Sequence, residues 1–227
     1  MTRIQAIVFD FDGVLVDSEP IRFKAGAQAL AEVGVSLTWE LFLKHWFGRT
    51  DRAGLRDILR DQFEGDGDRV IERRNALYEA WLDEVPTYPD TVQLLQRTPD
   101  GIRLAVATGS RRTEVEQILV RVGLSRRFHA IVTAEDYVSA KPAPDPFLAA
   151  ARRLDVEPVS CLVVEDTSAG VAAARAAGMP VLAVDRGRGA ALDLATWKVT
   201  GLGEVSLTAE GDVVVRTGIT HRDSHQA

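Results

Sequence analysis

Four short apolar runs, each followed by a polar or glycine-rich turn, restrict the fold of this sequence more than any other feature. Continuous apolar runs of this length are typical of parallel strands that helices cover on both faces. The runs are residues 6–9, 104–107, 161–164 and 181–184, and residues 130–132 are a weaker fifth candidate. Nearer the carboxyl terminus, residues 197–199 and 212–215 could be edge strands.

Segments with helical periodicity alternate with these runs. Apolar residues within 115–122 are spaced i, i+3, i+4 and i+7, and Gly123 stands where the C-cap of a helix is expected. Residues 146–154 and 168–177 are rich in alanine and indicate two more helices. Because strands and helices alternate, we predict an α/β fold with a doubly wound parallel sheet.

Residues 17–88 interrupt this alternation, because their periodic segments all have the spacing of helices. Thr38 is the expected N-cap of a helix over residues 39–46. We therefore predict a catalytic core formed by residues 1–16 and 89–227, with a helical cap domain, residues 17–88, inserted after the first strand. Three tryptophans are expected to form the core of the cap: Trp39, Trp46 and Trp81.

Composition and charge exclude several classes of protein. The formal net charge of −6 argues against a binder of nucleic-acid backbones, which usually carries a basic face. No apolar stretch approaches the ~18 residues of a membrane span, and the first residues lack the pattern of a secretory signal. Cys161 is the only cysteine in the sequence, so an intrachain disulfide and a cysteine metal cluster are excluded. We expect a cytoplasmic protein, monomeric or weakly dimeric, with no nucleic-acid or membrane partner and with a frayed end at residues 220–227.

Polar side chains follow the predicted strands. In open α/β sheets, ligands bind beyond the carboxyl ends of the strands. The residues at these ends are Asp10 and Asp12 after the first run, Thr108 after the second, and Glu165 and Asp166 after the third, with Lys141 before the helix at 146–154. Carboxylates that meet at one edge of a sheet repel each other. A divalent cation relieves this repulsion, and a set of oxygen ligands suits Mg²⁺.

These residues resemble the motifs of the haloacid dehalogenase (HAD) superfamily. The four motifs are matched in order by residues 10–20 (DFDGVLVDSEP), by Thr108, by Lys141, and by Glu165 with Asp166. Residues 140–147 and 165–170 are similar to the β-phosphoglucomutase-like phosphatase branch. The resemblance covers residues 4–184 and implies a Rossmann-like core that carries an inserted helical cap.

The resemblance implies a catalytic role for each motif residue. Asp10 would be the nucleophile and would form an aspartyl phosphate. Asp12 would protonate the leaving oxygen and then deprotonate the attacking water, which typically accelerates a reaction by about 10²–10⁴-fold. Thr108 and Lys141 would bind the phosphoryl oxygens.

The resemblance also implies a Mg²⁺ cofactor. Asp10, Asp166 and the backbone carbonyl of Asp12 would hold the cation. Glu165 would be either a further ligand or an outer partner that orients the others. The cation would screen the repulsion between the Asp10 carboxylate and the incoming phosphate.

Four further residues are candidates for binding the rest of the substrate: Ser110, Arg111, Arg49 and Arg74. Arginine can hold a phosphate or a carboxylate through two parallel hydrogen bonds. The alternative for the two arginines of the cap, Arg49 and Arg74, is a solvated face rich in salt bridges. Arg186 and Arg188, in the glycine-rich loop after the last apolar run, are expected at the surface.

The motif residues also have structural interpretations. Asp10 and Asp12 could simply form a turn, because aspartate is common after strands. Lys141 could be a surface lysine. Either Thr108 or Ser110 could be the N-cap of the helix that follows the second strand.

The predicted function is hydrolysis of a small phosphate monoester, a sugar phosphate or a phosphorylated small organic acid, by a Mg²⁺-dependent phosphatase. An inserted cap limits access to small substrates. A β-phosphoglucomutase-type mutase is the alternative, but Arg22 stands where that mutase has a histidine, and residues 48–51 do not reproduce its Gly-x-Ser-Arg pattern. A non-catalytic binding or regulatory module on the same fold would lack at least one motif residue. All four critical residues are present: Asp10, Asp12, Lys141 and Asp166.

Overall fold

The chain divides into two compact units, one made of Met1–Val16 with Thr87–Ala227 and the other of Asp17–Pro86. The computed structural model describes residues 3–215. Within that range the first unit contains the strands, and the second is helical. The end that was predicted to be frayed, residues 220–227, lies outside the described residues.

A six-stranded sheet forms the centre of the first unit, in the order β3-β2-β1-β4-β5-β6. The strands are β1 (Ala6–Phe9), β2 (Arg103–Ala107), β3 (Ala130–Val132), β4 (Cys161–Glu165), β5 (Val181–Val184) and β6 (Trp197–Val199). Every pairing in this sheet is parallel. The prediction of a parallel sheet is therefore confirmed, and the weak candidate at residues 130–132 is a strand.

The chain order reverses between β1 and β4, which lie side by side at the centre of the sheet. From β1 the chain moves outward through β2 and β3, and it then returns to place β4, β5 and β6 on the other side of β1. Such a switch point opens a crevice beyond the carboxyl ends of the two central strands. The sequence motifs after β1 and β4 are therefore brought to one place.

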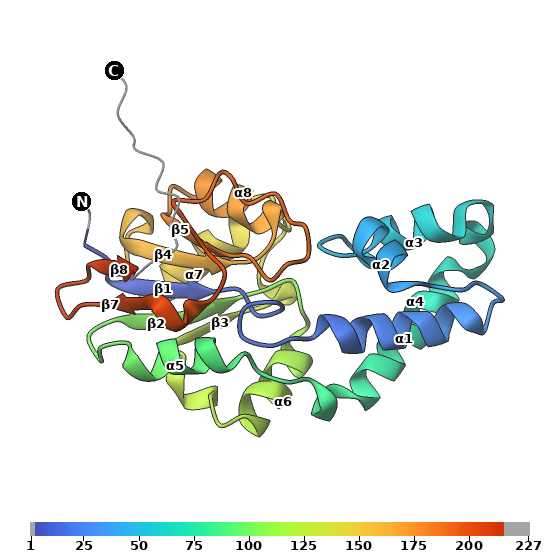
Figure 1. Cartoon of the computed structure of the whole chain (residues 1–227), viewed down its shortest axis with the longest axis horizontal. Helices are drawn as coiled ribbons and strands as arrows, with labels where there is room; N and C mark the ends of the chain where they lie inside the picture. Colours follow the sequence, from blue (N-terminus) through green and yellow to red (C-terminus); the bar gives the residue numbers. More distant parts are fainter. Residues whose placement is uncertain (1–2, 216–227) are drawn as a thin grey trace, which may run out of the picture. The chain divides into compact units, whose positions relative to one another are not determined.

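Helices cover both faces of the sheet, as a doubly wound fold requires. They are α5 (Pro89–Arg97), α6 (Arg112–Arg121), α7 (Asp145–Leu154) and α8 (Ser168–Ala176). In Figure 1, α7 and α8 lie on one side of the sheet, and α5 and α6 lie on the other. Buried apolar side chains such as Val8, Phe147 and Val163 join the face of the sheet to α7 and α8. The α/β class is confirmed.

The carboxyl-terminal part of the described chain adds β-structure. β6 is the edge strand of the sheet beside β5. A separate antiparallel pair follows, formed by β7 (Val205–Leu207) and β8 (Val213–Val215). The two sequence stretches that could be edge strands are thus both strands. Short 3-10 turns lie at Arg60–Gln62, Leu82–Glu84, Ser125–Arg127, Ala134–Asp136, Pro158–Ser160 and Leu202–Glu204.

The second unit is a group of helices: α1 (Glu19–Ala31), α2 (Trp39–His45), α3 (Asp51–Leu59) and α4 (Phe63–Ala80). Helix α4 packs against both α1 and α3. The predicted N-cap is confirmed, because the Thr38 hydroxyl accepts a hydrogen bond from the backbone N–H of Leu41 (3.2 Å). No helix among residues 3–215 is long and apolar enough to cross a membrane.

The tryptophans of this unit do not all lie in its core. Trp46 is buried, and its indole N–H donates to Asp51 (2.8 Å). Trp39 is 38% exposed and stacks on Phe42 from outside, with 5.3 Å between ring centroids. Trp81 is half-buried under the Lys24 ammonium, which lies 4.1 Å from the ring centroid. The prediction that all three form the core is wrong for Trp39, because it begins α2 on an exposed face.

Candidate active site

The candidate site begins at the carboxyl ends of β1 and β4. These strands pair with Phe9 opposite Val164, so Asp10 and Glu165 come next to each other. The hydrogen bonding continues past the end of β1, because the N–H of Asp10 donates to the carbonyl of Val164 (2.9 Å). The backbone of Asp10 is therefore held to β4 by the same kind of hydrogen bond as the strand before it.

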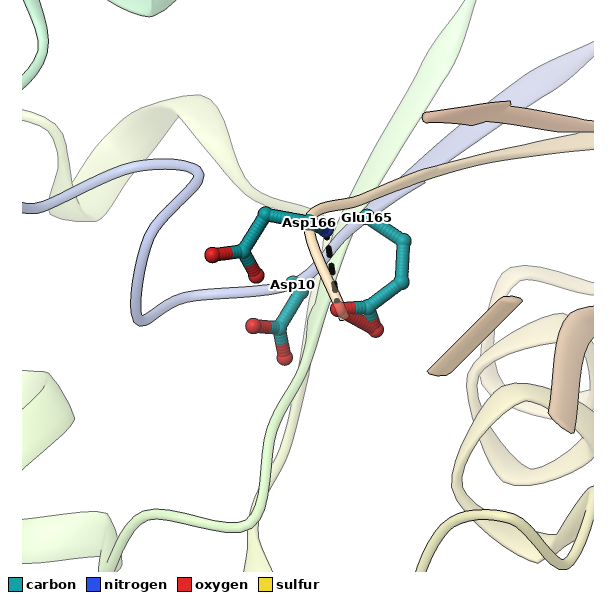
Figure 2. Close-up of side chains that lie close together, drawn as sticks. All are labelled: Asp10, Glu165 and Asp166. Carbon is teal, nitrogen blue, oxygen red and sulfur yellow. Dashed lines mark hydrogen bonds between the residues drawn. The ribbon is translucent and has the colours of Figure 1, made fainter. Parts of the chain in front are cut away.

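Three buried carboxylates meet at this edge (Figure 2). Asp10, Glu165 and Asp166 each offer an oxygen, and these oxygens all lie within 4.8 Å of one another. Burial, and then the negative charge of Glu165, raise the pKa of Asp10 to about 8. Buried carboxylates with such an excess of negative charge are a suitable set of donors for a hard divalent cation such as Mg²⁺.

Lys141 is the cation within this cluster. Its ammonium donates three hydrogen bonds, to Asp10 Oδ1 (2.6 Å), to Glu165 Oε2 (3.0 Å) and to the carbonyl of Ala107 (3.1 Å). An ammonium has three N–H donors, so each of them has an acceptor. Burial alone would lower the pKa of Lys141, but the charges of Asp10 and Glu165 outweigh it and raise that pKa. Lys141 is thus a largely buried, charged residue and not a surface lysine.

The Glu165 carboxylate is turned back toward the start of α8 (Figure 2). Its Oε1 accepts from the N–H of Asp166 (3.1 Å) and from the N–H (3.2 Å) and hydroxyl (3.1 Å) of Thr167. Gly170 leaves room for this conformation, since a Cβ there would lie 1.6 Å from Glu165 Oε2. Both oxygens of Glu165 are therefore engaged by protein donors. This geometry favours the outer, orienting role over direct ligation.

The turn after β1 carries Asp12 and packs against Asp166. Gly13 has a positive φ of +80°, and a Cβ there would lie 1.9 Å from Asp166 Oδ2. Glycine is required on both counts, because it adopts positive φ without strain and has no Cβ. The Asp12 carboxylate accepts a hydrogen bond from the Ser110 hydroxyl (2.5 Å). Ser110, predicted to bind substrate, therefore contacts the predicted acid–base residue.

Thr108 and Ser110 form the turn at the end of β2. Thr108 is buried, its N–H donates to Val132 (3.0 Å), and its hydroxyl accepts from the N–H of Ser110 (3.0 Å). The N-cap of α6 is Arg111, whose side chain makes no capping hydrogen bond. The interpretation of Thr108 or Ser110 as that N-cap is wrong, because α6 starts after both of them.

Two arginines that were expected at the surface, Arg186 and Arg188, have largely buried side chains at this edge of the sheet. Each has a side chain that is only 10% exposed. Arg188 Nη1 lies 3.9 Å from Asp166 Oδ2. The Arg186 Nε donates to the carbonyl of Gly13 (3.1 Å). The expectation is wrong because these residues follow β5, whose carboxyl end reaches the same edge as β1 and β4. The rule that was applied to the other strand ends would have found them.

The other candidates for substrate binding are held by acidic neighbours. Arg111 pairs with the buried Glu114 (2.7 Å). In the helical unit, Arg49 donates to Asp57 (2.6 Å). Their contact with substrate stays a prediction.

Arg74 is buried within the helical unit. Its Nη1 donates to Asn75 Oδ1 (2.8 Å) and to Asp51 Oδ2 (3.4 Å), and its guanidinium carbon lies 5.3 Å from the centroid of the Tyr78 ring. The side chain is 6% exposed. These contacts make Arg74 part of the packing of its own unit, and its role in substrate binding also stays a prediction.

Comparisons with known proteins identify the family of the chain. Residues 7–184 match the family model described as haloacid dehalogenase-like hydrolase. The fructose-1-phosphate phosphatase YqaB of Escherichia coli is 33% identical over 183 residues, which are 80% of this chain and 97% of that protein. The protein SUPPRESSOR OF QUENCHING 1, chloroplastic, of Arabidopsis thaliana is 35% identical over 190 residues, which are 80% of this chain but only 18% of that protein.

The fold is also similar to that of a solved structure. The crystal structure of β-phosphoglucomutase from Clostridium difficile aligns with a TM-score of 0.75 and 26% identity, and it covers 88% of this chain and 92% of that chain. The similarity extends over both the sheet and the helical insertion, since it includes most of the sequence.

Without metal, the stability of the protein should fall as the pH rises toward the pKa of Asp10. Burial and the charge of Glu165 raise this pKa from 3.8 to about 8. The folded chain therefore binds the proton more tightly than the unfolded chain, and the cost of ionising Asp10 grows between the two values. In EDTA, Asp10→Asn should be more stable than wild type by about 1–3 kcal/mol at pH 8, and by less at pH 5. Urea unfolding at several pH values measures this difference.

The control for this experiment is Asp100→Asn. Asp100 is an exposed carboxylate in the turn before β2, at the opposite edge of the sheet. Its removal should leave the pH dependence of unfolding unchanged. A difference between Asp10→Asn and wild type that is the same at pH 5 and pH 8 would contradict the prediction.

Gly170→Ala should disrupt the cluster without removing any of its charged groups. The new Cβ would lie 1.6 Å from Glu165 Oε2, so Glu165 must move and its hydrogen bond with Lys141 must change. We expect a loss of about 1–3 kcal/mol in unfolding free energy. Gly65→Ala is the matched control, because it lies in α4 with nothing within 4 Å of the new Cβ and should stabilise its helix. Equal changes in the two variants would count against the close packing at Gly170.

Proposed function

Because the chain belongs to the haloacid dehalogenase-like hydrolase family, we propose that it is a Mg²⁺-dependent phosphatase that hydrolyses the phosphate monoester of a small metabolite. The observation that carries the proposal is the buried cluster in which Lys141 bridges Asp10 and Glu165 beside Asp166. The substrate would be a sugar phosphate or a phosphorylated small organic acid. The class of enzyme is that of the phosphoric monoester hydrolases.

The reaction proceeds in two steps, and Asp10 is the nucleophile of the first. An oxygen of its carboxylate forms a bond to phosphorus while the bond from phosphorus to the ester oxygen breaks. Lys141 holds Asp10 through Oδ1 and so orients the carboxylate for this attack. Asp12 donates a proton to the leaving oxygen, and the alcohol departs.

The second step returns the enzyme to its starting state. Asp12, now a carboxylate, takes a proton from a water molecule that attacks phosphorus. The bond between phosphorus and the Asp10 oxygen breaks, and inorganic phosphate leaves. Ser110 holds the Asp12 carboxylate on the side of the site formed by β2, so Asp12 is oriented for both proton transfers.

The Asp10 and Asp166 carboxylates, with the backbone carbonyl of Asp12, would hold Mg²⁺. Glu165 orients Lys141 and the start of α8 instead of ligating the cation. When bound, the cation supplies positive charge that lets the Asp10 carboxylate approach an anionic phosphate. Thr108 and Lys141 would bind the phosphoryl oxygens, and most of the catalytic effect in such a reaction comes from positioning and charge.

Hydrolysis is favoured over transfer to a second sugar position by the residues of the helical unit. Arg22, where the mutase of the same branch has a histidine, donates from Nε to the Ser18 hydroxyl (3.3 Å), and its guanidinium carbon lies 4.5 Å from the Tyr78 ring centroid. Arg22 is thus held within its own unit. A guanidinium with its very high pKa also cannot replace histidine in proton transfer near neutral pH.

Wild-type protein with Mg²⁺ should release phosphate from at least one ester in a panel of sugar phosphates and phosphorylated organic acids. Asp10→Asn should lower this release by about 10³-fold or more, because it removes the nucleophile. Asp100→Asn, remote from the site, should retain full activity. Retention of activity in Asp10→Asn would refute the nucleophile. Conversion of a sugar phosphate to its isomer without phosphate release would instead indicate the mutase.

Mg²⁺ should raise the melting temperature of the protein, and the two acids after β4 should affect this shift differently. Asp166→Asn removes a ligand, so we expect the apparent affinity for Mg²⁺ to fall by more than ~100-fold. Glu165→Gln removes an outer partner, for which a loss of about 10–100-fold in metal affinity is typical. Titrations of Mg²⁺ followed by thermal unfolding measure both values. A larger loss in Glu165→Gln than in Asp166→Asn would make Glu165 the ligand.

A further inference from the structure

We propose that Arg186 and Asp90 form a positioning pair that holds the turn after β1 and thereby aims the Asp12 carboxylate. Neither residue belongs to the sequence motifs that define the proposed reaction. The inference rests on the proposed function, because it assumes that Asp12 is the acid–base group. It goes beyond that function by assigning the orientation of Asp12 to one residue of α5 and one residue of the loop after β5.

The guanidinium of Arg186 lies between α5 and the turn. Its Nη1 donates to Asp90 Oδ2 (2.9 Å), and its Nη2 donates to Asp90 Oδ1 (3.2 Å). The remaining donor, Nε, reaches the carbonyl of Gly13 (3.1 Å). Its guanidinium carbon lies 3.7 Å from the centroid of the Tyr88 ring, a cation–π contact. One planar group thus binds a carboxylate in bidentate fashion and holds a backbone carbonyl.

A second hydrogen bond holds the next carbonyl of the same turn. The hydroxyl of Thr91, in the first turn of α5, donates to the carbonyl of Val14 (2.6 Å) and accepts from Arg186 Nη2 (3.4 Å). Thr91 is fully buried. Two consecutive carbonyls, those of Gly13 and Val14, are therefore held by side chains that meet at the start of α5.

The Asp90 end of the pair is itself firmly held. Asp90 Oδ2 also accepts from the N–H of Leu202 (2.8 Å). Burial acts to raise the pKa of Asp90, but the hydrogen bonds from Arg186 and Leu202 outweigh it and lower that pKa. The pair is consequently charged at neutral pH, and it connects the turn to both α5 and the segment after β6.

The turn needs such support because it leaves the sheet. Asp12 lies beyond the pairing of β1 with β2 and β4, which ends at Phe9. The turn closes on itself through the N–H of Gly13, which donates to Val16 (2.8 Å). The Asp12 carboxylate is held from one side by Ser110. Arg186 holds the backbone carbonyl of Gly13, the residue after Asp12. The contacts of Ser110 and Arg186 together therefore define the position of the Asp12 carboxylate.

A purely structural role is the competing explanation, because breaking a buried ion pair destabilises any protein. The two explanations differ in how the loss of activity depends on the leaving group. An alkyl phosphate, such as a sugar phosphate, needs a proton from Asp12 as its oxygen leaves. p-Nitrophenyl phosphate has a leaving group that departs without a proton. In the first step, the transfer of the phosphoryl group to Asp10, a displaced Asp12 therefore slows only the reaction of the alkyl phosphate, whereas a general loss of structure slows the reaction of both substrates.

The test compares kcat/KM of Arg186→Gln on these two substrates, since kcat/KM reports the first chemical step. For the sugar phosphate, kcat/KM should fall by about 30–100-fold, and for p-nitrophenyl phosphate it should fall by less than about threefold. Arg97→Gln is the matched control. Arg97 lies at the other end of α5 and donates to the carbonyls of Gly203 (3.1 Å) and Gln93 (3.3 Å), without contact to the turn. Arg97→Gln should change kcat/KM by the same factor for the two substrates.

Asp12→Asn supplies the reference for a lost acid–base group. It should show the same preference for p-nitrophenyl phosphate, and adding Arg186→Gln to it should cause little further loss on the sugar phosphate, because both act through one group. Two results would overturn the positioning role. One is a loss of kcat/KM in the double variant that equals the product of the two single losses, and the other is an equal loss on both substrates in Arg186→Gln. An Asp12→Asn variant without any preference would remove the acid role itself, and with it this inference.

Asp90→Asn tests the pair if Arg186→Gln does not fold. The substitution preserves size and leaves Arg186 in place, but it removes the charge that holds the guanidinium. We expect a selective loss on the sugar phosphate of about three- to tenfold, with p-nitrophenyl phosphate unchanged. An Asp90→Asn enzyme with wild-type kcat/KM on both substrates would overturn the proposal.

Discussion

The buried ammonium of Lys141 is the group on which the geometry of the catalytic edge depends. It bridges Asp10 and Glu165 across the ends of β1 and β4, with distances of 2.6 and 3.0 Å. Removing Lys141 would leave these two carboxylates without their counter-charge, and the loss of a charged partner in a buried pair typically costs about 3–5 kcal/mol. The hydrogen bonds of Glu165 to Thr167, and the missing side chain of Gly170, follow from the need to direct one carboxylate at this ammonium.

Parallel pairing of the two central strands is what brings these charges together. Phe9 lies opposite Val164, so the first residues past the apolar pairing are Asp10 on one strand and Glu165 at the end of the other. A slip of one residue would turn either side chain to the opposite face of the sheet. The apolar runs therefore affect the site indirectly. Their burial determines the register of the strands, and the register determines where Asp10 and Glu165 lie.

The alternation of apolar runs and helices predicted the sheet, and the strand ends predicted which residues meet there. Both depend on patterns that can be recognised in the sequence without knowledge of the tertiary contacts. The contacts of individual side chains cannot be predicted in this way, because they depend on which loops return to the same edge of the sheet. The hydrogen bond from Ser110 to Asp12 was not predicted, and Trp39 was expected in a core and is exposed. Arg186 was misjudged for a different reason: its glycine-rich surroundings suggested an exposed loop, although it directly follows β5.

The same edge is both a weakness of the fold and the source of its proposed chemistry. Three carboxylates meet at this edge, those of Asp10, Glu165 and Asp166. Within residues 3–215, the ion pairs of these carboxylates are with two cationic groups, Lys141 and Arg188. Burial, and then the negative charge of Glu165, raise the pKa of Asp10, and the excess of negative charge also repels an anionic phosphate. A divalent cation reverses both effects, so cation and phosphate ester should each strengthen the binding of the other. If the charges of these carboxylates were fully neutralised by cationic side chains, the protein would be more stable without metal. The site would then lack the excess negative charge that attracts a divalent cation, and with it this coupling between cation and phosphate ester.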